Sequence, residues 1–143
     1  MSKTHKTKID YRLVQIEETG FSMQLPEDFK PATPVQFYIS LQATYIAEQR
    51  HLVVANRIEM RQEANTQTLA HLSVNYRFEL ISSEELKIIA GIPIIPEEIQ
   101  TAINAIVLSS SRGVLFGQFK GTPLHGTILP LIDAGNFAAH SGS

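Results

Sequence analysis

The feature that most constrains the fold is an alternation of apolar and polar side chains that recurs in three consecutive segments, interrupted at Tyr38, Ile46 and Asn56. In the first, residues 35–47, the odd positions are all apolar: Val35, Phe37, Ile39, Leu41, Ala43, Tyr45 and Ala47. Residues 52–60 and 70–80 repeat this period of two, and only short polar turns separate the segments. Because successive side chains of a strand point to opposite faces, the pattern predicts an antiparallel meander with one buried and one wet face.

The segment before these strands, residues 9–25, also reads as extended, but the phase of its alternation slips. Such a slip predicts a bulge or a bend within a strand. A linker with three prolines follows, at Pro26, Pro31 and Pro34, and this density of proline excludes a helix or a central strand. The linker is too long for a tight hairpin, so we expect it to cross one end or one face of the sheet.

Beyond residue 91 the apolar period changes to three and four, which is typical of an amphipathic helix. Pro96 suits its first position, and Lys120 and Gly121 suit its end near Phe119. The predicted stripe is Ile99, Ala102, Ile103, Ile106, Ser110, Gly113, Val114 and Gly117. One flank of this helix has only small side chains, at Ala102, Ala105, Ser109 and Gly113. That flank would let another backbone approach closely, so we predict that it forms an oligomer interface.

The segment after the helix, residues 122–137, is apolar yet contains prolines and glycines that exclude a regular helix. We expect it to lie extended against an apolar surface. The complete prediction is a flexible tail at residues 1–8 and one α+β domain at residues 9–143. In that domain an antiparallel sheet packs with one long C-terminal helix and an extended apolar tail.

Composition excludes several functional classes. The chain of 143 residues has a formal net charge of −2, so it lacks the basic field that nucleic-acid binding needs. It has no cysteine, which excludes disulfides and thiolate chemistry. No apolar run reaches the roughly 18 residues of a membrane span, and none follows the basic N-terminus as in a signal peptide. We therefore expect a cytoplasmic protein without nucleic-acid binding or membrane insertion.

The side chains that catalysis requires form no recognisable pattern. His51, His71 and His125 are the candidate metal or acid–base residues, but none has a ligand spacing such as HxxxH. The serines at 109–111 lie in mid-helix and not in a G-x-S-x-G turn. We expect no catalytic residue, no metal and no cofactor. The alternative is an enzyme in which two of these histidines meet each other and a carboxylate.

The chain carries more apolar side chains than one sheet face and one helix need, although these two layers already complete a domain. The additional residues are Phe29, Tyr38, Phe116, Phe119, Leu124, Ile128, Leu131 and Phe137. This excess indicates an oligomer interface or a groove for apolar polypeptide. The alternative is that the tail simply completes the core.

The order of these parts resembles the SecB family of protein-export chaperones, over residues 9–137. The local matches are Ser111-Arg112 in the helix, the helix end Lys120-Gly121-Thr122, Pro130 in the tail, and residues 21–26 (FSMQLP) at the close of the first strand. The resemblance implies a four-stranded antiparallel sheet with a crossover between strands 1 and 2. It also implies a homotetramer built as a dimer of dimers, with the long helices between two sheets.

The same resemblance implies a function. SecB-like proteins hold unfolded, apolar polypeptide without ATP, in export or as chaperones of an antitoxin. Matched onto this chain, the groove residues are Phe29, Leu124, Ile128, Leu131 and Phe137. The alternative is an α+β domain that binds a small molecule or lipid in a closed pocket.

One property of the family is not expected here, namely docking to the translocation ATPase SecA. The acidic sheet positions that the family uses match Gly20, Gln24 and Ser73, which carry no charge. The chain also ends at Ser143, which leaves little room for the family's second helix and acidic C-terminus.

Overall fold

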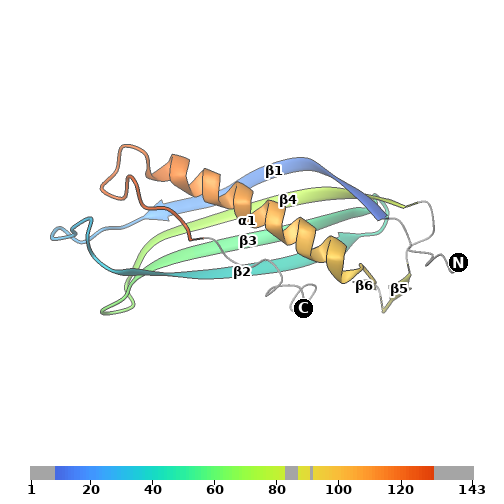
Figure 1. The fold of residues 1–143 in the computed structure, drawn as a ribbon, viewed down its shortest axis with the longest axis horizontal. Helices are drawn as coiled ribbons and strands as arrows, with labels where there is room; N and C mark the ends of the chain where they lie inside the picture. Colours follow the sequence, from blue (N-terminus) through green and yellow to red (C-terminus); the bar gives the residue numbers. More distant parts are fainter. Residues whose placement is uncertain (1–8, 83–86, 91, 131–143) are drawn as a thin grey trace, which may run out of the picture.

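The computed structural model describes residues 9–82, 87–90 and 92–130, and it has two layers (Figure 1). The strands of the main sheet are β1 (Ile9–Met23), β2 (Val35–Ile46), β3 (His51–Gln62) and β4 (Thr68–Ser82). They are antiparallel, in the order β1-β4-β3-β2. The helix α1 (Glu97–Phe119) runs diagonally across one face, which we call the inner face (Figure 1). The predicted α+β architecture, with its crossover between β1 and β2, is confirmed.

The alternation seen in the sequence sets the burial of the two central strands. On β3 and β4 every second side chain points to the inner face and is 2% exposed or less: Leu52, Val54, Asn56, Ile58, Met60, Ala70, Leu72, Val74, Tyr76, Phe78 and Leu80. Their neighbours on the opposite face, which we call the outer face, are polar or partly exposed, except Leu69, which is fully buried beside the register shift between Met60 and Arg61. The core therefore lies between the central strands and α1.

The phase slip in the first strand corresponds to two irregularities in the pairing of β1 with β4. The register shifts between Leu13 and Gln15 and again between Glu18 and Gly20. Between the two shifts Ile16 pairs with Tyr76, so Ile16 lies on the inner face although its side chain is 49% exposed. The predicted bulge is confirmed.

The helix begins one residue later than predicted. Pro96 is the residue before α1, and its carbonyl accepts hydrogen bonds from the N–H groups of Ile99 and Gln100, both at 3.0 Å. At the other end Gly121 has φ +78°, the left-handed conformation that glycine adopts most easily at a helix end.

The predicted apolar stripe of α1 is also rotated from the face that is buried. The buried residues are Gln100, Ile103, Asn104, Val107, Leu108, Ser111, Leu115 and Phe119. Gln100 and Asn104, which apolar periodicity ignores, lie on that face and partly satisfy each other, because Gln100 Nε2 donates to Asn104 Oδ1 at 3.1 Å. Ala102, Ser110 and Gly113 accordingly lie nearer to solvent.

The segment after α1 folds back along the same face of the sheet (Figure 1). Leu124 and Leu129 are 1% and 2% exposed and belong to the core. Arg112 of the helix donates from Nε to the Leu129 carbonyl at 2.8 Å. The segment therefore packs on the apolar core as expected, but it is not extended throughout, because residues 121–126 form turns and only residues 127–130 continue without them. A small hairpin of β5 (Ile88–Ile89) and β6 (Ile92–Pro93), which the sequence did not indicate, precedes the helix.

Candidate functional site

The three candidate histidines do not come together. His51 pairs with Glu79 at one end of the β3–β4 ladder, whereas His71 pairs with Glu59 at the other end. His125 lies beyond the helix, with its ring centroid 6.4 Å from that of Phe116. Among the described residues no group of three His, Cys, Asp or Glu could hold a metal ion.

The last of the three mid-helix serines lies inside the core. Ser111 is fully buried, and its Oγ lies 2.6 Å from the hydroxyl of Tyr76 on β4. Burial raises the pKa of Tyr76, and the hydrogen bond with Ser111 opposes this rise. The pair therefore joins the helix to the sheet inside the core and is closed to a substrate.

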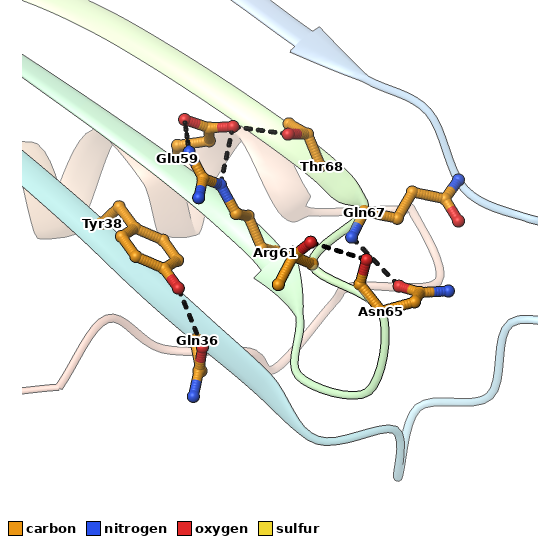
Figure 2. Close-up of polar contacts among 8 residues, drawn as sticks. Gln36, Tyr38, Glu59, Arg61, Asn65, Gln67 and Thr68 are labelled. Carbon is orange, nitrogen blue, oxygen red and sulfur yellow. Dashed lines mark hydrogen bonds and ion pairs between the residues drawn. The ribbon is translucent and has the colours of Figure 1, made fainter.

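The most connected polar cluster lies on the outer face (Figure 2). Arg61 donates to the carboxylate of Glu59 from Nε at 3.0 Å and from Nη2 at 3.1 Å, and its guanidinium carbon lies 4.1 Å from the Tyr38 ring centroid. Thr68 donates a further hydrogen bond to Glu59. The bonds from Arg61 and Thr68 lower the pKa of the Glu59 carboxyl from 4.5 to about 2. These groups satisfy one another, so the cluster is structural.

The rest of the outer face carries no open carboxylate on the two central strands. Glu79 accepts a hydrogen bond from Arg12 at 3.1 Å, and Arg57 is exposed without a hydrogen bond or ion pair to any described residue. Gly20 and Ser73, two of the uncharged positions singled out in the sequence, are paired neighbours on β1 and β4. Gln24 lies just beyond β1, where its N–H donates to the Leu69 carbonyl at 2.9 Å.

A partly covered set of apolar side chains lies on the inner face of β2. We call its residues the inner β2 row: Val35, Phe37, Ile39, Ala43 and Tyr45. All five pack against the core but are only partly buried, whereas the corresponding rows of β3 and β4 are almost completely covered. The reason is position, because β2 lies at the edge of the sheet and the diagonal helix leaves part of its inner face uncovered (Figure 1).

The five groove residues expected from the sequence fall into three groups. Phe29, in the crossover, is partly buried against the core, and Ile128 is 51% exposed. Leu124 is 1% exposed and lies within the core. Leu131 and Phe137 lie outside the described residues. The sequence pattern predicted that the inner β2 row is buried. The row is only partly buried because β2 lies at the sheet edge, and strand order is therefore the information that would have identified it as accessible.

The small-residue flank of α1 faces away from the sheet. Ala105, Ser109 and Gly113 are exposed, and Ala102 is partly buried. A Cβ added to Gly113 would meet nothing within 4 Å among the described atoms. This flank therefore leaves room for a close neighbour.

Comparisons with known proteins identify the fold. No family model matches the sequence, and no curated protein matches it. Among solved structures, the chain is similar to the Mycobacterium tuberculosis Rv1957 SecB-like chaperone in complex with a ChAD peptide from the Rv1956 HigA1 antitoxin. The TM-score is 0.64 at 12% sequence identity, over 85% of this chain and 89% of that chain. The fold is therefore SecB-like. No helix in the described ranges is long and apolar enough to cross a membrane.

Proposed function

We propose that this chain is a SecB-like chaperone that holds flexible, apolar segments of other polypeptides without a nucleotide. The observation that carries the proposal is the inner β2 row, an apolar surface that the chain's own helix leaves partly uncovered. Single exposed apolar residues are common on protein surfaces, but several partly covered ones on one face of one strand, here on both sides of the buried Leu41, are typical of a binding site. A large side chain contributes about 1.5–3 kcal/mol when it passes from full exposure to full burial, and each partly buried side chain of this row can contribute a fraction of that when a client covers it.

The proposed binding surface extends beyond β2. Phe29 stands in the crossover that leads into this strand, and Ile128 stands in the segment that folds back after the helix. Leu131 and Phe137 continue that segment in the sequence and complete the proposed contact set. Leu124 supports the segment from within the core. A binding surface of this kind requires neither a catalytic residue nor a cofactor.

The solved neighbour supports a polypeptide partner, since that protein is in complex with a peptide from an antitoxin. We propose the same class of partner for this chain, a flexible polypeptide segment, either of an antitoxin or of an unfolded precursor. A polypeptide requires a surface open at both ends, whereas a small molecule or lipid requires an enclosed cavity. The open edge of β2 favours the polypeptide.

We further propose that the chain assembles through the small-residue flank of α1. The exposed Ala105, Ser109 and Gly113 let a second helix approach closely, and Phe116, which is 42% exposed, adds apolar area on the same helix. A dimer of dimers is the arrangement that this proposal favours.

The test of the function is protection of a reduced, denatured model protein from aggregation, with purified chain and no nucleotide. We expect protection at stoichiometric amounts, and the absence of protection at excess would contradict the proposal. Ile128→Ser combined with Phe137→Ser should weaken protection, because both remove apolar contact area. The matched control is Val14→Ser with Ile81→Ser, at side chains that are 40% and 45% exposed on β1 and β4. This control should protect normally.

A further inference from the structure

The outer face of the sheet is rich in arginine. The four strands of the main sheet contain no lysine, but four of the chain's six arginines lie on their outer face: Arg12, Arg57, Arg61 and Arg77. Arginine is enriched and lysine depleted at protein interfaces relative to the rest of the surface. The guanidinium is also the more weakly hydrated of the two cations, so a partner loses less by covering it. This composition makes the outer face a candidate interaction surface.

Two of these arginines are already paired with carboxylates. Arg61 donates to Glu59 at 3.0 and 3.1 Å (Figure 2), and Arg12 lies 3.1 Å from Glu79. An arginine that already binds a carboxylate of the chain offers little to a partner, and the same holds for the carboxylate. The binding capacity of this face therefore rests on the other two arginines.

The other two have no carboxylate partner among the described residues. Arg57 is exposed and makes no hydrogen bond or ion pair there. Arg77 is half-buried, and its Nη1 lies 3.2 Å from Gln49 Oε1 and 3.1 Å from His51 Nδ1. Because a guanidinium only donates, both contacts are to uncharged acceptors, and the positive charge of Arg77 is not neutralised. Both arginines can therefore bind a carboxylate from outside the chain.

We call Arg57, Ala55, Ser73, Asn75 and Arg77 the outer arginine patch. Arg57 on β3 pairs with Ser73 on β4, and Arg77 follows Ser73 by four residues on the same face. At about 3.3 Å per residue, the two arginines stand about 13 Å apart along the strands. Ala55 and Asn75 pair with each other in between. Because these side chains are short, the backbone of a partner can approach the sheet between the two arginines.

One carboxylate of the chain stands beside this patch. Glu17 on β1 pairs with Asn75, is exposed, and makes no hydrogen bond or ion pair with a described residue. Arg77 pairs with Gln15, two residues earlier on the same strand, so Glu17 is a diagonal neighbour of Arg77. Glu17 therefore opposes any anion that approaches Arg77, although it does not form an ion pair with this arginine.

We propose that the outer arginine patch binds an acidic segment of a partner polypeptide. Arg57 and Arg77 donate charge-assisted hydrogen bonds to carboxylates of that segment, and such bonds are roughly twice as strong as neutral ones. The patch lies on the opposite side of the sheet from the inner β2 row. One chain can therefore hold an acidic partner and an apolar client at the same time, and the inference goes beyond the proposed function.

The occupant of the patch is an acidic polypeptide and not a second copy of the chain or a nucleic acid. A two-fold interface presents the same patch on both subunits, so two copies that met here would bring arginine against arginine. Nucleic acid carries a phosphate about every 3.4 Å of each strand and is held by many cations. This patch has only two, on a chain whose formal net charge is −2, and a short acidic segment needs no more.

A labelled twelve-residue peptide that alternates glutamate with serine tests the inference by fluorescence anisotropy. It has no apolar residue, so it does not occupy the inner β2 row. Its counterpart has glutamine in place of every glutamate. At low salt the acidic peptide should bind at least about tenfold more tightly than the glutamine peptide, and added salt should weaken its binding because it screens the charges.

Variants of the protein locate the binding. Arg57→Gln and Arg77→Gln should each weaken binding of the acidic peptide about threefold or more, and together about tenfold. The matched control Lys120→Gln removes one positive charge at the exposed end of α1, on the other side of the sheet, and should bind within about twofold of the unaltered chain. Glu17→Gln should bind about twofold more tightly, because it removes the opposing carboxylate. If Arg77→Gln does not fold, Arg57→Gln and Glu17→Gln decide the question.

The outcomes separate this inference from the proposed function. Equal binding of the two peptides would overturn it, and so would equal losses in Arg57→Gln and Lys120→Gln, because the attraction would then belong to no particular surface. A twelve-nucleotide single-stranded DNA that binds more tightly than the acidic peptide, and more weakly to Arg57→Gln, would assign the patch to nucleic acid and overturn it as well. Protection from aggregation by the double variant Arg57→Gln with Arg77→Gln should equal that of the unaltered chain, and a loss of protection would contradict two separate surfaces.

Discussion

The hydrogen bond between Tyr76 and Ser111 offers a direct test of how the helix is fixed on the sheet. Both residues are fully buried, and their oxygens are 2.6 Å apart. The perturbations are Ser111→Ala, Tyr76→Phe and the two together. Ser111→Ala leaves the phenol hydroxyl buried in the core without this partner, while Tyr76→Phe removes that hydroxyl altogether.

The two single changes should differ in cost. A buried donor left without its partner costs about 1–3 kcal/mol, and this is the expectation for Ser111→Ala. After Tyr76→Phe the serine can instead bond a carbonyl of the preceding helical turn, so the expected cost is about 0.5–1.5 kcal/mol. In the Tyr76→Phe background Ser111→Ala should cost less than about 0.5 kcal/mol, because alanine is the better helix former. The expected coupling energy is therefore about 1–2 kcal/mol.

Denaturant unfolding at one fixed protein concentration measures these differences, because an assembling chain has a concentration-dependent stability. For a chain of this length, 1 kcal/mol corresponds to about 3–4 °C in Tm, so thermal unfolding gives a second measurement. If Ser111→Ala costs the same free energy in both backgrounds, the bond does not join helix to sheet and the packing described above is wrong.

Three further predictions concern charge and assembly. The lowered pKa of Glu59, about 2 against an ordinary 4.5, means that its ionised form stabilises the fold above pH 4.5. That contribution is about 1 kcal/mol for a partly exposed pair, and it is lost as the pH falls from 4.5 towards 2. In Glu59→Gln the Tm should therefore change less with pH between 4.5 and 2 than in the unaltered chain. Ser109→Arg should lower the assembly mass measured by light scattering, and an unchanged mass would exclude this flank as the interface. Calorimetry at low salt should show binding to the translocation ATPase SecA weaker than about 10 μM, because Gly20, Gln24 and Ser73 lack charge; sub-micromolar affinity would contradict this.

The sequence predicts the elements of this fold well because their periodicities are local. Alternation over residues 35–47 places β2 within one residue of its observed end at Ile46. The phase slip in residues 9–25 anticipates the bulged β1. The helix ends at Phe119, as predicted, because Gly121 adopts the left-handed conformation with φ +78° two residues later.

What periodicity cannot supply is the environment of each element. The apolar row that includes Phe37 and Tyr45 reads like the rows of the central strands, yet it is partly exposed because β2 lies at the sheet edge. Strand order depends on contacts that are distant in the sequence, so a local pattern does not contain it. The same holds for α1, whose buried face includes Gln100 and Asn104 because these two amides pair with each other.

For the candidate site, the sequence predicted an excess of apolar residues but not where they are accessible. Ile128 is exposed while Leu124, four residues earlier, is buried. The difference arises from the way the segment packs on the core, with Leu129 held through its carbonyl by Arg112, and no pattern in residues 122–130 indicates it.

Hydrogen exchange of the chain, with and without a saturating unfolded client, tests most directly whether polypeptide is held on the inner face along β2. The account predicts slower exchange in the client-bound state at the amides of Val35, Phe37, Ile39, Leu41, Ala43 and Tyr45 and in residues 122–130. The outer-face positions of β4, such as Ser73 and Asn75, should exchange at the same rate in both states. A client that binds and leaves exchange along β2 unchanged, or protects only other segments, would contradict the account.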